Sequence, residues 1–224
     1  MRLRERSRIV RFHRRRIARY GEGTPASLGW KVPTSQSTRF EVICRVGDLT
    51  GSTILDLGCG YGDLRAYIDE RFSGVTYIGV DAVPEFIEHA ARRYQDRADT
   101  SFLRADFAHL DLPTADYVVS SGAFAYRRRD QAYYTDIIQK MYDAATVGVA
   151  FNMLDDATFV AHGLLAGHDK EHILAFCRSI APAARLVSGY LADDFTVFMY
   201  RSDTVEACES ESGTDGGKQA IRPT

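Results

Sequence analysis

The sequence predicts an α/β protein whose doubly wound sheet has seven strands, mostly parallel, with helices on both faces. Three observations predict this class. Short β-rich runs alternate with helical patterns, a glycine-rich turn follows the first strand, and two strand-like runs separated by three residues close the series. Alternation of strands and helices favours a parallel sheet. The closing pair predicts a terminal hairpin that adds one antiparallel strand.

The strands are expected where β-branched and aromatic residues gather. They cover Thr53–Leu57, Val75–Val80, Ser101–Leu103, Asp116–Ser120, Val147–Phe151, Arg185–Leu191 and Phe195–Tyr200. The fourth begins after the break at Leu112-Pro113, and only Ala192, Asp193 and Asp194 separate the last two.

The helices are expected where apolar residues recur at helical spacing. They cover 39–49, Asp63–Phe72, Pro84–Tyr94, Gln131–Ala144 and Lys170–Ile180. Pro84 suits a first turn, where its missing N–H does no harm, and the last helix stops before Pro182. Residues 21–38 are rich in Gly, Ser, Thr and Pro and are predicted to be a loop.

An arginine-rich arm precedes these elements. Residues 1–20 hold nine Arg and one acid, Glu5, so the arm carries +8; the whole chain carries −2, which leaves −10 on the rest. Ile9, Phe12, Ile17 and Tyr20 recur at roughly helical spacing. We therefore expect an amphipathic helix that lies against its own domain. Contact with nucleic acid or an acidic ligand is the alternative.

The turn after the first strand carries the main chemical signal. Residues 56–62 read Asp-Leu-Gly-Cys-Gly-Tyr-Gly. Glycines permit a sharp turn and a close ligand, and open α/β sheets bind nucleotides at this position. Dinucleotide-binding turns read Gly-x-Gly-x-x-Gly, but Asp63 stands where the third glycine would fall, and no Gly-Lys-Ser/Thr of a P-loop is present.

The glycine spacing instead resembles the first motif of class I S-adenosylmethionine-dependent methyltransferases, a Rossmann-like family. Stretches between about residues 20 and 201, such as Leu28-Gly29-Trp30 and Phe151-Asn152, resemble a group of small bacterial methyltransferases of unassigned substrate. The resemblance implies S-adenosylmethionine as the cofactor. The Asn/Asp-Pro-Pro-Tyr/Phe motif of many nitrogen methyltransferases is absent after the fourth strand, which makes base methylation less favoured.

Acidic residues after the next two strands complete the expected cofactor site. Asp81 can accept two hydrogen bonds from a ribose diol, with a helix cap as its alternative role. By resemblance, Asp106 meets the adenine amino group, Phe107 packs on the ring, and Arg39 pairs with the cofactor carboxylate. The full set of expected cofactor residues is Arg39, Asp56, Gly58, Cys59, Gly60, Gly62, Asp81, Ala82, Asp106, Phe107, Ser120, Ser121 and Gly122.

The acceptor side is less defined by the sequence. We expect Trp30, Phe124, Tyr126, Asn152 and His162 to contact the substrate. Tyr126 and His162 are candidate bases, which methyl transfer needs only where the nucleophile must lose a proton. No metal site is expected, because Ser120 and Ser121 stand where metal-binding carboxylates would be needed.

The function expected from these features is transfer of a methyl group to an oxygen or nitrogen of a small molecule. One alternative is a methyltransferase that acts on RNA or protein and uses the arginine-rich arm to bind it; nucleic acid is a possible partner but not the favoured one. Another alternative is a module that binds the cofactor or a partner without catalysis. All three functions stay open at this point, because the fold alone does not determine the function.

We expect three parts in the chain: an N-terminal helical and loop cap over 1–50, a cofactor-binding methyltransferase domain over 51–202, and a disordered polar tail over 203–224. No apolar run reaches the ~18 residues of a membrane span. The four cysteines form no Cys-x-x-Cys pair, which indicates free thiols in a reducing cytoplasm.

Overall fold

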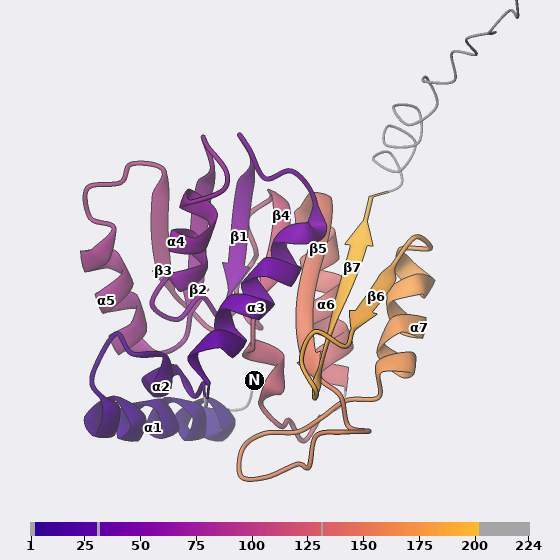
Figure 1. Ribbon diagram of the computed structural model, residues 1–224, viewed down its shortest axis with the longest axis horizontal. Helices are drawn as coiled ribbons and strands as arrows, with labels where there is room; N and C mark the ends of the chain where they lie inside the picture. Colours follow the sequence, from indigo (N-terminus) through magenta and orange to yellow (C-terminus); the bar gives the residue numbers. More distant parts are fainter. Residues whose placement is uncertain (1–2, 31, 131, 202–224) are drawn as a thin grey trace, which may run out of the picture.

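The computed structural model describes residues 3–30, 32–130 and 132–201. Its sheet has the order β3-β2-β1-β4-β5-β7-β6. The strands are β1 (Thr53–Leu57), β2 (Thr76–Asp81), β3 (Thr100–Arg104), β4 (Ala115–Ser120), β5 (Ala145–Leu154), β6 (Arg185–Ser188) and β7 (Asp194–Tyr200). The first five are parallel, and β7 pairs antiparallel with both β5 and β6 (Figure 1). The predicted seven-stranded, mostly parallel sheet with an antiparallel hairpin strand is confirmed.

The helices are α1 (Leu3–Tyr20), α2 (Pro25–Leu28), α3 (Pro33–Ile43), α4 (Asp63–Asp69), α5 (Pro84–Arg93), α6 (Ala132–Ala144) and α7 (Lys170–Ile180). Two 3₁₀ turns, η1 (Cys44–Val46) and η2 (Ala123–Ala125), complete the set of described elements. The helix predicted over 39–49 begins earlier and ends in η1, and the helix predicted to reach Phe72 ends at Asp69.

The loop predicted over 21–38 is wrong, because this stretch holds α2 and the first half of α3. Both helices have proline in their first turn, where its fixed φ suits the helix. The Thr24 side chain accepts a hydrogen bond from Ser27 N–H and so caps α2, and Gly29 ends that helix in the left-handed conformation. Residues typical of loops here serve as helix caps.

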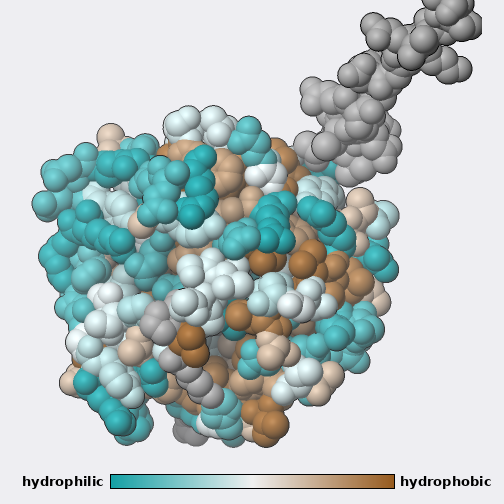
Figure 2. Space-filling model, in the orientation of Figure 1, coloured by the Kyte–Doolittle hydropathy of each residue, from teal (hydrophilic) through white to brown (hydrophobic). Residues whose placement is uncertain are grey.

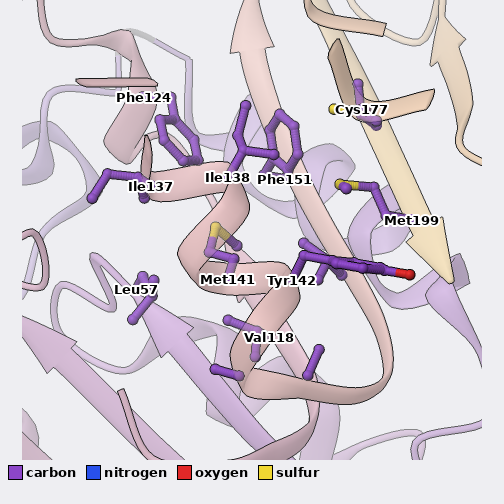
Figure 3. Packing of buried hydrophobic residues seen from close by; sticks show 14 of the residues in the cluster. Leu57, Val118, Phe124, Ile137, Ile138, Met141, Tyr142, Phe151, Cys177 and Met199 are labelled. Atoms are coloured by element: carbon purple, nitrogen blue, oxygen red, sulfur yellow. The ribbon is translucent and has the colours of Figure 1, made fainter. Parts of the chain in front are cut away.

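Two hydrophobic cores hold the layers together. One lies between the sheet and the α6 and α7 helices; Figure 3 shows Phe124, Phe151, Met141 and Cys177 among its side chains. The other packs α3 and α4 on the opposite face of the sheet. Val187 and Tyr190, near the β6 edge, remain partly exposed, and Figure 2 shows hydrophobic surface over β6 and β7.

Helix α1 lies across the end of the sheet where the parallel strands have their carboxyl ends, and the loop over 155–169 lies at the same end (Figure 1). A third hydrophobic cluster, built on Tyr61, Val83 and Phe86, packs against Val10 and Ile17 of α1. The prediction that the arm is a helix docked on its own domain is confirmed for Leu3–Tyr20. Within the described ranges, none of the helices is both long enough and apolar enough to cross a membrane. The predicted tail over 203–224 lies outside the described residues.

Candidate functional site

A cavity of about 490 Å³ opens at the carboxyl ends of the parallel strands, a volume in the range of small-molecule sites. Segments from α1 to the loop before β7 line it. Fourteen sequence-predicted residues lie on its wall: Trp30, Arg39, Asp56, Gly58, Cys59, Gly60, Asp81, Ala82, Asp106, Phe107, Ser121, Gly122, Tyr126 and Asn152. The sequence therefore brings most of the expected site to one place.

The glycine-rich turn is held against β2 by its own backbone. The N–H groups of Gly58 and Cys59 both donate to the Val80 carbonyl, at 2.7 and 3.2 Å. Gly58 has φ +85°, and a Cβ there would lie 2.6 Å from the Ala123 Cβ. Only glycine combines that left-handed conformation with so close a contact. The turn thus sits tightly between β2 and the segment after β4.

Asp81 ties the end of β2 to this turn. Its Oδ2 accepts a hydrogen bond from Gly60 N–H at 3.1 Å, and its Oδ1 accepts one from Val83 N–H at 2.8 Å. Burial raises the pKa of this carboxyl to about 6, and the backbone hydrogen bonds oppose that rise. Each oxygen keeps a further lone pair, so the carboxylate can still accept hydrogen bonds from a ligand in the cavity.

Asp56, at the other side of the turn, is buried, and only one of its two carboxylate oxygens has a hydrogen-bond partner among the described residues. Its Oδ2 accepts the Tyr77 hydroxyl at 2.5 Å, while its Oδ1 has no hydrogen-bond partner among the described residues. Burial raises the pKa of Asp56 to about 7; the Tyr77 hydrogen bond opposes the rise and the nearby Asp81 charge adds to it. A cationic ligand group beside Oδ1 would favour the ionised form.

Two further buried polar atoms in the cavity wall lack partners within the described part of the chain: Trp30 Nε1 and Ser121 Oγ. The Trp30 ring is fixed between the Arg39 guanidinium, 4.7 Å from the ring centroid, and Gly122, where a Cβ would lie 2.7 Å from the ring. Buried polar atoms are normally satisfied. Two donors and the free oxygen of Asp56 therefore suit a ligand that carries both an acid and an amine.

A buried polar network forms the wall behind Trp30. Arg39 donates from Nε to Asp194 Oδ2 at 2.5 Å and also forms an ion pair with Asp194 through Nη2. Asn152 donates to Asp194 at 2.8 Å and accepts from Gly122 N–H at 2.8 Å. Arg39 and Asn152, predicted to hold cofactor and substrate, thus use these groups to bind Asp194, which was not among the predicted site residues. Their direct contact with a ligand stays a prediction.

Four predicted residues do not line the cavity. Gly62 faces Phe102 and Tyr94. Ser120 is buried and donates to the Leu57 carbonyl at 2.8 Å. Phe124 belongs to the core, with its ring centroid 5.3 Å from that of Phe151 (Figure 3). His162 lies on the surface beside the Val160 carbonyl. Ser120 binds the backbone, Phe124 packs in the core and His162 faces solvent, and residue type alone could not predict these positions.

His13 of α1 is a cavity residue that we did not predict. Its Nε2 lies 2.5 Å from the Tyr126 hydroxyl, and its Nδ1 lies 3.1 Å from the Ser27 carbonyl. The ring also packs edge-on against Phe86, with centroids 4.8 Å apart. One signal was present in the sequence: Ile9, His13 and Ile17 recur every fourth residue, which places them on one helix face.

Comparison with known proteins agrees with this geometry. Residues 54–148 match the family model described as a methyltransferase domain. This match covers less than half of the chain; together with the strand order and the glycine-rich turn, it makes the chain similar to the class I S-adenosylmethionine-dependent methyltransferases.

Particular relatives can be named on that basis. The chain is 37% identical over 107 residues to a methyltransferase homologue of Mycobacterium tuberculosis, Rv1506c, covering 46% of this chain and 63% of that protein. It is 38% identical over 84 residues to trans-aconitate 2-methyltransferase of the same organism, covering 38% of this chain and 31% of that enzyme. The chain therefore spans less than two thirds of the length of these relatives.

Two solved structures share the fold. Magnesium protoporphyrin IX methyltransferase from Synechocystis PCC 6803, with bound S-adenosylmethionine, aligns with a TM-score of 0.66 at 17% identity, covering 88% of this chain and 97% of that one. N-methyltransferase NodS from Bradyrhizobium japonicum WM9, in complex with S-adenosylhomocysteine, aligns with a TM-score of 0.65 at 16% identity, covering 86% and 98%.

Proposed function

We propose that this protein transfers the methyl group of S-adenosylmethionine to an oxygen or nitrogen of a small molecule bound in the 490 Å³ cavity. The observation that carries the proposal is the set of three buried polar atoms in the cavity wall that have no hydrogen-bond partner among the described residues: Asp56 Oδ1, Trp30 Nε1 and Ser121 Oγ. They match the amino acid portion of the cofactor, which carries an ammonium and a carboxylate. The bound cofactor supplies an electrophilic methyl carbon, so the protein has to align a nucleophile and exclude water.

Different residues of the chain would bind different parts of the cofactor. Asp56 Oδ1 would accept from the ammonium, and Trp30 Nε1 and Ser121 Oγ would donate to the carboxylate. Asp81 would accept from the ribose hydroxyls, and Asp106, whose side chain is largely buried, would face the adenine amino group. Charged hydrogen bonds of this kind are the strong ones.

The names of similar proteins support a small-molecule acceptor. The similar curated proteins include enzymes named trans-aconitate 2-methyltransferase, fatty-acid O-methyltransferase and magnesium-protoporphyrin O-methyltransferase. In this chain, apolar side chains of α1 and of the loop over 155–169 line the same cavity as the glycine-rich turn, among them Ile9, Phe12 and Leu165. Such a wall suits an acceptor with an apolar body.

Titration calorimetry with S-adenosylhomocysteine and, separately, with NAD tests the proposal. We expect S-adenosylhomocysteine to bind and NAD not to bind, because position 63 lacks the third glycine of a dinucleotide turn. Binding of NAD alone would refute it.

A second candidate acceptor is RNA, which one observation favours. Arg8, Arg11, Arg15 and Arg19 are exposed on α1, and no acidic side chain of the described residues forms an ion pair with them. RNA binding through such a stripe would weaken steeply as salt increases. Methylation of transcripts whose binding is lost at high salt would favour this candidate over the small molecule.

A further inference from the structure

The pair formed by His13 and Tyr126 joins two segments 113 positions apart on the cavity wall. His13 is 3% exposed. The Ser27 carbonyl can only accept a hydrogen bond, so His13 Nδ1 must carry the proton that it donates there. Burial, helped by the neighbouring Arg16 charge and opposed by the Ser27 hydrogen bond, lowers the pKa of His13 to about 4. The neutral ring therefore presents an unprotonated Nε2 to Tyr126.

This arrangement fixes the direction of the Tyr126 hydroxyl. With Nε2 as the acceptor, Tyr126 must donate its proton to His13, at 2.5 Å. Its oxygen lone pairs are then the only polar feature it can offer to the cavity. A carboxylate oxygen placed beside them would be repelled, whereas a group that carries a proton on its nucleophilic atom would donate a hydrogen bond.

We propose that Tyr126 and His13 select and deprotonate the methyl acceptor, which is therefore a hydroxyl, phenol or amine compound and not a carboxylate. The inference rests on the proposed function. Tyr126 acts as the catalytic residue that touches the acceptor, and His13 as the positioning residue that takes the proton from Tyr126.

The step balances in atoms and charge. The nucleophilic oxygen or nitrogen forms a bond to the methyl carbon as the carbon–sulfur bond breaks, and that electron pair stays on sulfur. The acceptor's proton passes to Tyr126 Oη as the Tyr126 proton passes to His13 Nε2. The positive charge lost at sulfur reappears on the His13 ring, which later releases its proton to solvent. The net charge in the cavity is therefore the same immediately before and after methyl transfer.

Neighbouring charges face this pair from three elements. Arg16 lies on α1, Asp81 ends β2, and Arg128 follows η2. The pKa of Tyr126 is raised mainly by burial and also by Asp81, while the two arginines oppose that rise. Tyr126 thus stays protonated at neutral pH and can pass a proton only in concert with His13.

The test uses the full chain with S-adenosylmethionine and acceptors matched in their apolar bodies: octanol, octylamine and octanoate, and 4-propylphenol with 4-propylbenzoate. Formation of S-adenosylhomocysteine is measured from pH 6 to pH 8 for the wild type, Tyr126→Phe and His13→Gln. Glutamine can still accept the Tyr126 hydrogen bond but cannot take its proton. His172→Gln, at an exposed position on α7, is the matched control.

We expect the wild type to methylate at least one alcohol, phenol or amine, with kcat nearly constant over this range because His13 stays neutral throughout it. Both variants should lose about 100-fold in kcat/KM at pH 7, the lower end of general acid–base effects. Their rates should rise with pH as the acceptor ionises in solution. Their affinity for S-adenosylhomocysteine should stay within about threefold of the wild type, since general catalysis leaves binding intact.

Three results would overturn the inference. Methylation confined to the carboxylates, or to none of the five compounds, contradicts the acceptor class. Full activity of His13→Gln contradicts the proton transfer. A tenfold or greater loss of S-adenosylhomocysteine affinity in Tyr126→Phe means that the hydroxyl binds the cofactor instead. Failure of the wild type to bind S-adenosylhomocysteine at all would refute the proposed function itself, which separates the two failures.

Discussion

The cavity has two sides that are held in place in different ways. We call the turn over 58–62, Asp81 and the Arg39–Asp194–Asn152 network the sheet side, and α1 with Tyr126 the α1 side. The sheet side depends on left-handed glycines and on buried charges that compensate one another. The α1 side depends on ring packing and one short hydrogen bond between distant segments. Damage to the sheet side should therefore affect stability most, and damage to the α1 side should affect turnover most.

Asp194→Ala should have the largest effect, because it leaves the Arg39 guanidinium buried and unpaired. We expect a loss of about 3–5 kcal/mol in the free energy of unfolding, the usual result of removing one partner of a buried pair. Urea denaturation measures it. Glu41→Ala removes the exposed pair with Arg45 and should change little. Equal losses in the two variants would mean that burial does not distinguish these pairs.

Gly58→Ala should rank next. The change forces alanine into φ +85° and places its Cβ against Ala123. We expect a loss of about 2–4 kcal/mol in unfolding free energy from strain and overlap together. Gly51→Ala is the matched control, because Gly51 has φ +71° with nothing within 4 Å of the added Cβ. If both variants melted alike, the contact with Ala123 would have no role.

Asp81→Ala tests the sheet side as a binding surface. We expect affinity for S-adenosylhomocysteine to fall by about 1.5–3 kcal/mol, the usual loss for a charged hydrogen bond. Asp81→Asn should lose less. Calorimetry on correctly folded variants measures both affinities. An unchanged dissociation constant in Asp81→Ala would mean that Asp81 only holds the backbone of Gly60 and Val83 and does not bind the cofactor.

Phe12→Asp tests the α1 side and should have the smallest effect on global stability, about 1–2 kcal/mol, because Phe12 is only partly buried and lies outside the two main cores. The Phe12 side chain is only partly exposed and lines the cavity, so an added charge there should also loosen α1 and reduce turnover. Arg15→Ala, on the exposed face, should stay within about 0.5 kcal/mol. Limited proteolysis of α1 and thermal melts distinguish Phe12→Asp from Arg15→Ala. If Phe12→Asp changed neither the protease sensitivity of α1 nor the melting temperature, the result would contradict a docked α1.

The same contrast explains how far the sequence alone could go. Local patterns determined β1 and α7, whose predicted bounds match the structure, and the glycine turn with Asp81 follows from spacing along one βαβ unit. The loop prediction for residues 21–38 fails because proline is typical both of loops and of helix starts, and Pro25 and Pro33 begin helices here. The roles of Asp194 and His13 depend on partners more than 100 positions away, and no local pattern specifies such a pairing.

The contacts of α1 also set an order for folding during synthesis. This helix leaves the ribosome before every surface that it covers: Glu85, which pairs with Arg14, follows 71 positions later, and Tyr126, which pairs with His13, follows 113 positions later. Its apolar face packs on Tyr61, Val83 and Phe86, so that docking surface is absent until the start of α5 has been made. The cavity is therefore closed late, and an incomplete nascent chain exposes the apolar stripe of α1 to the cellular chaperones.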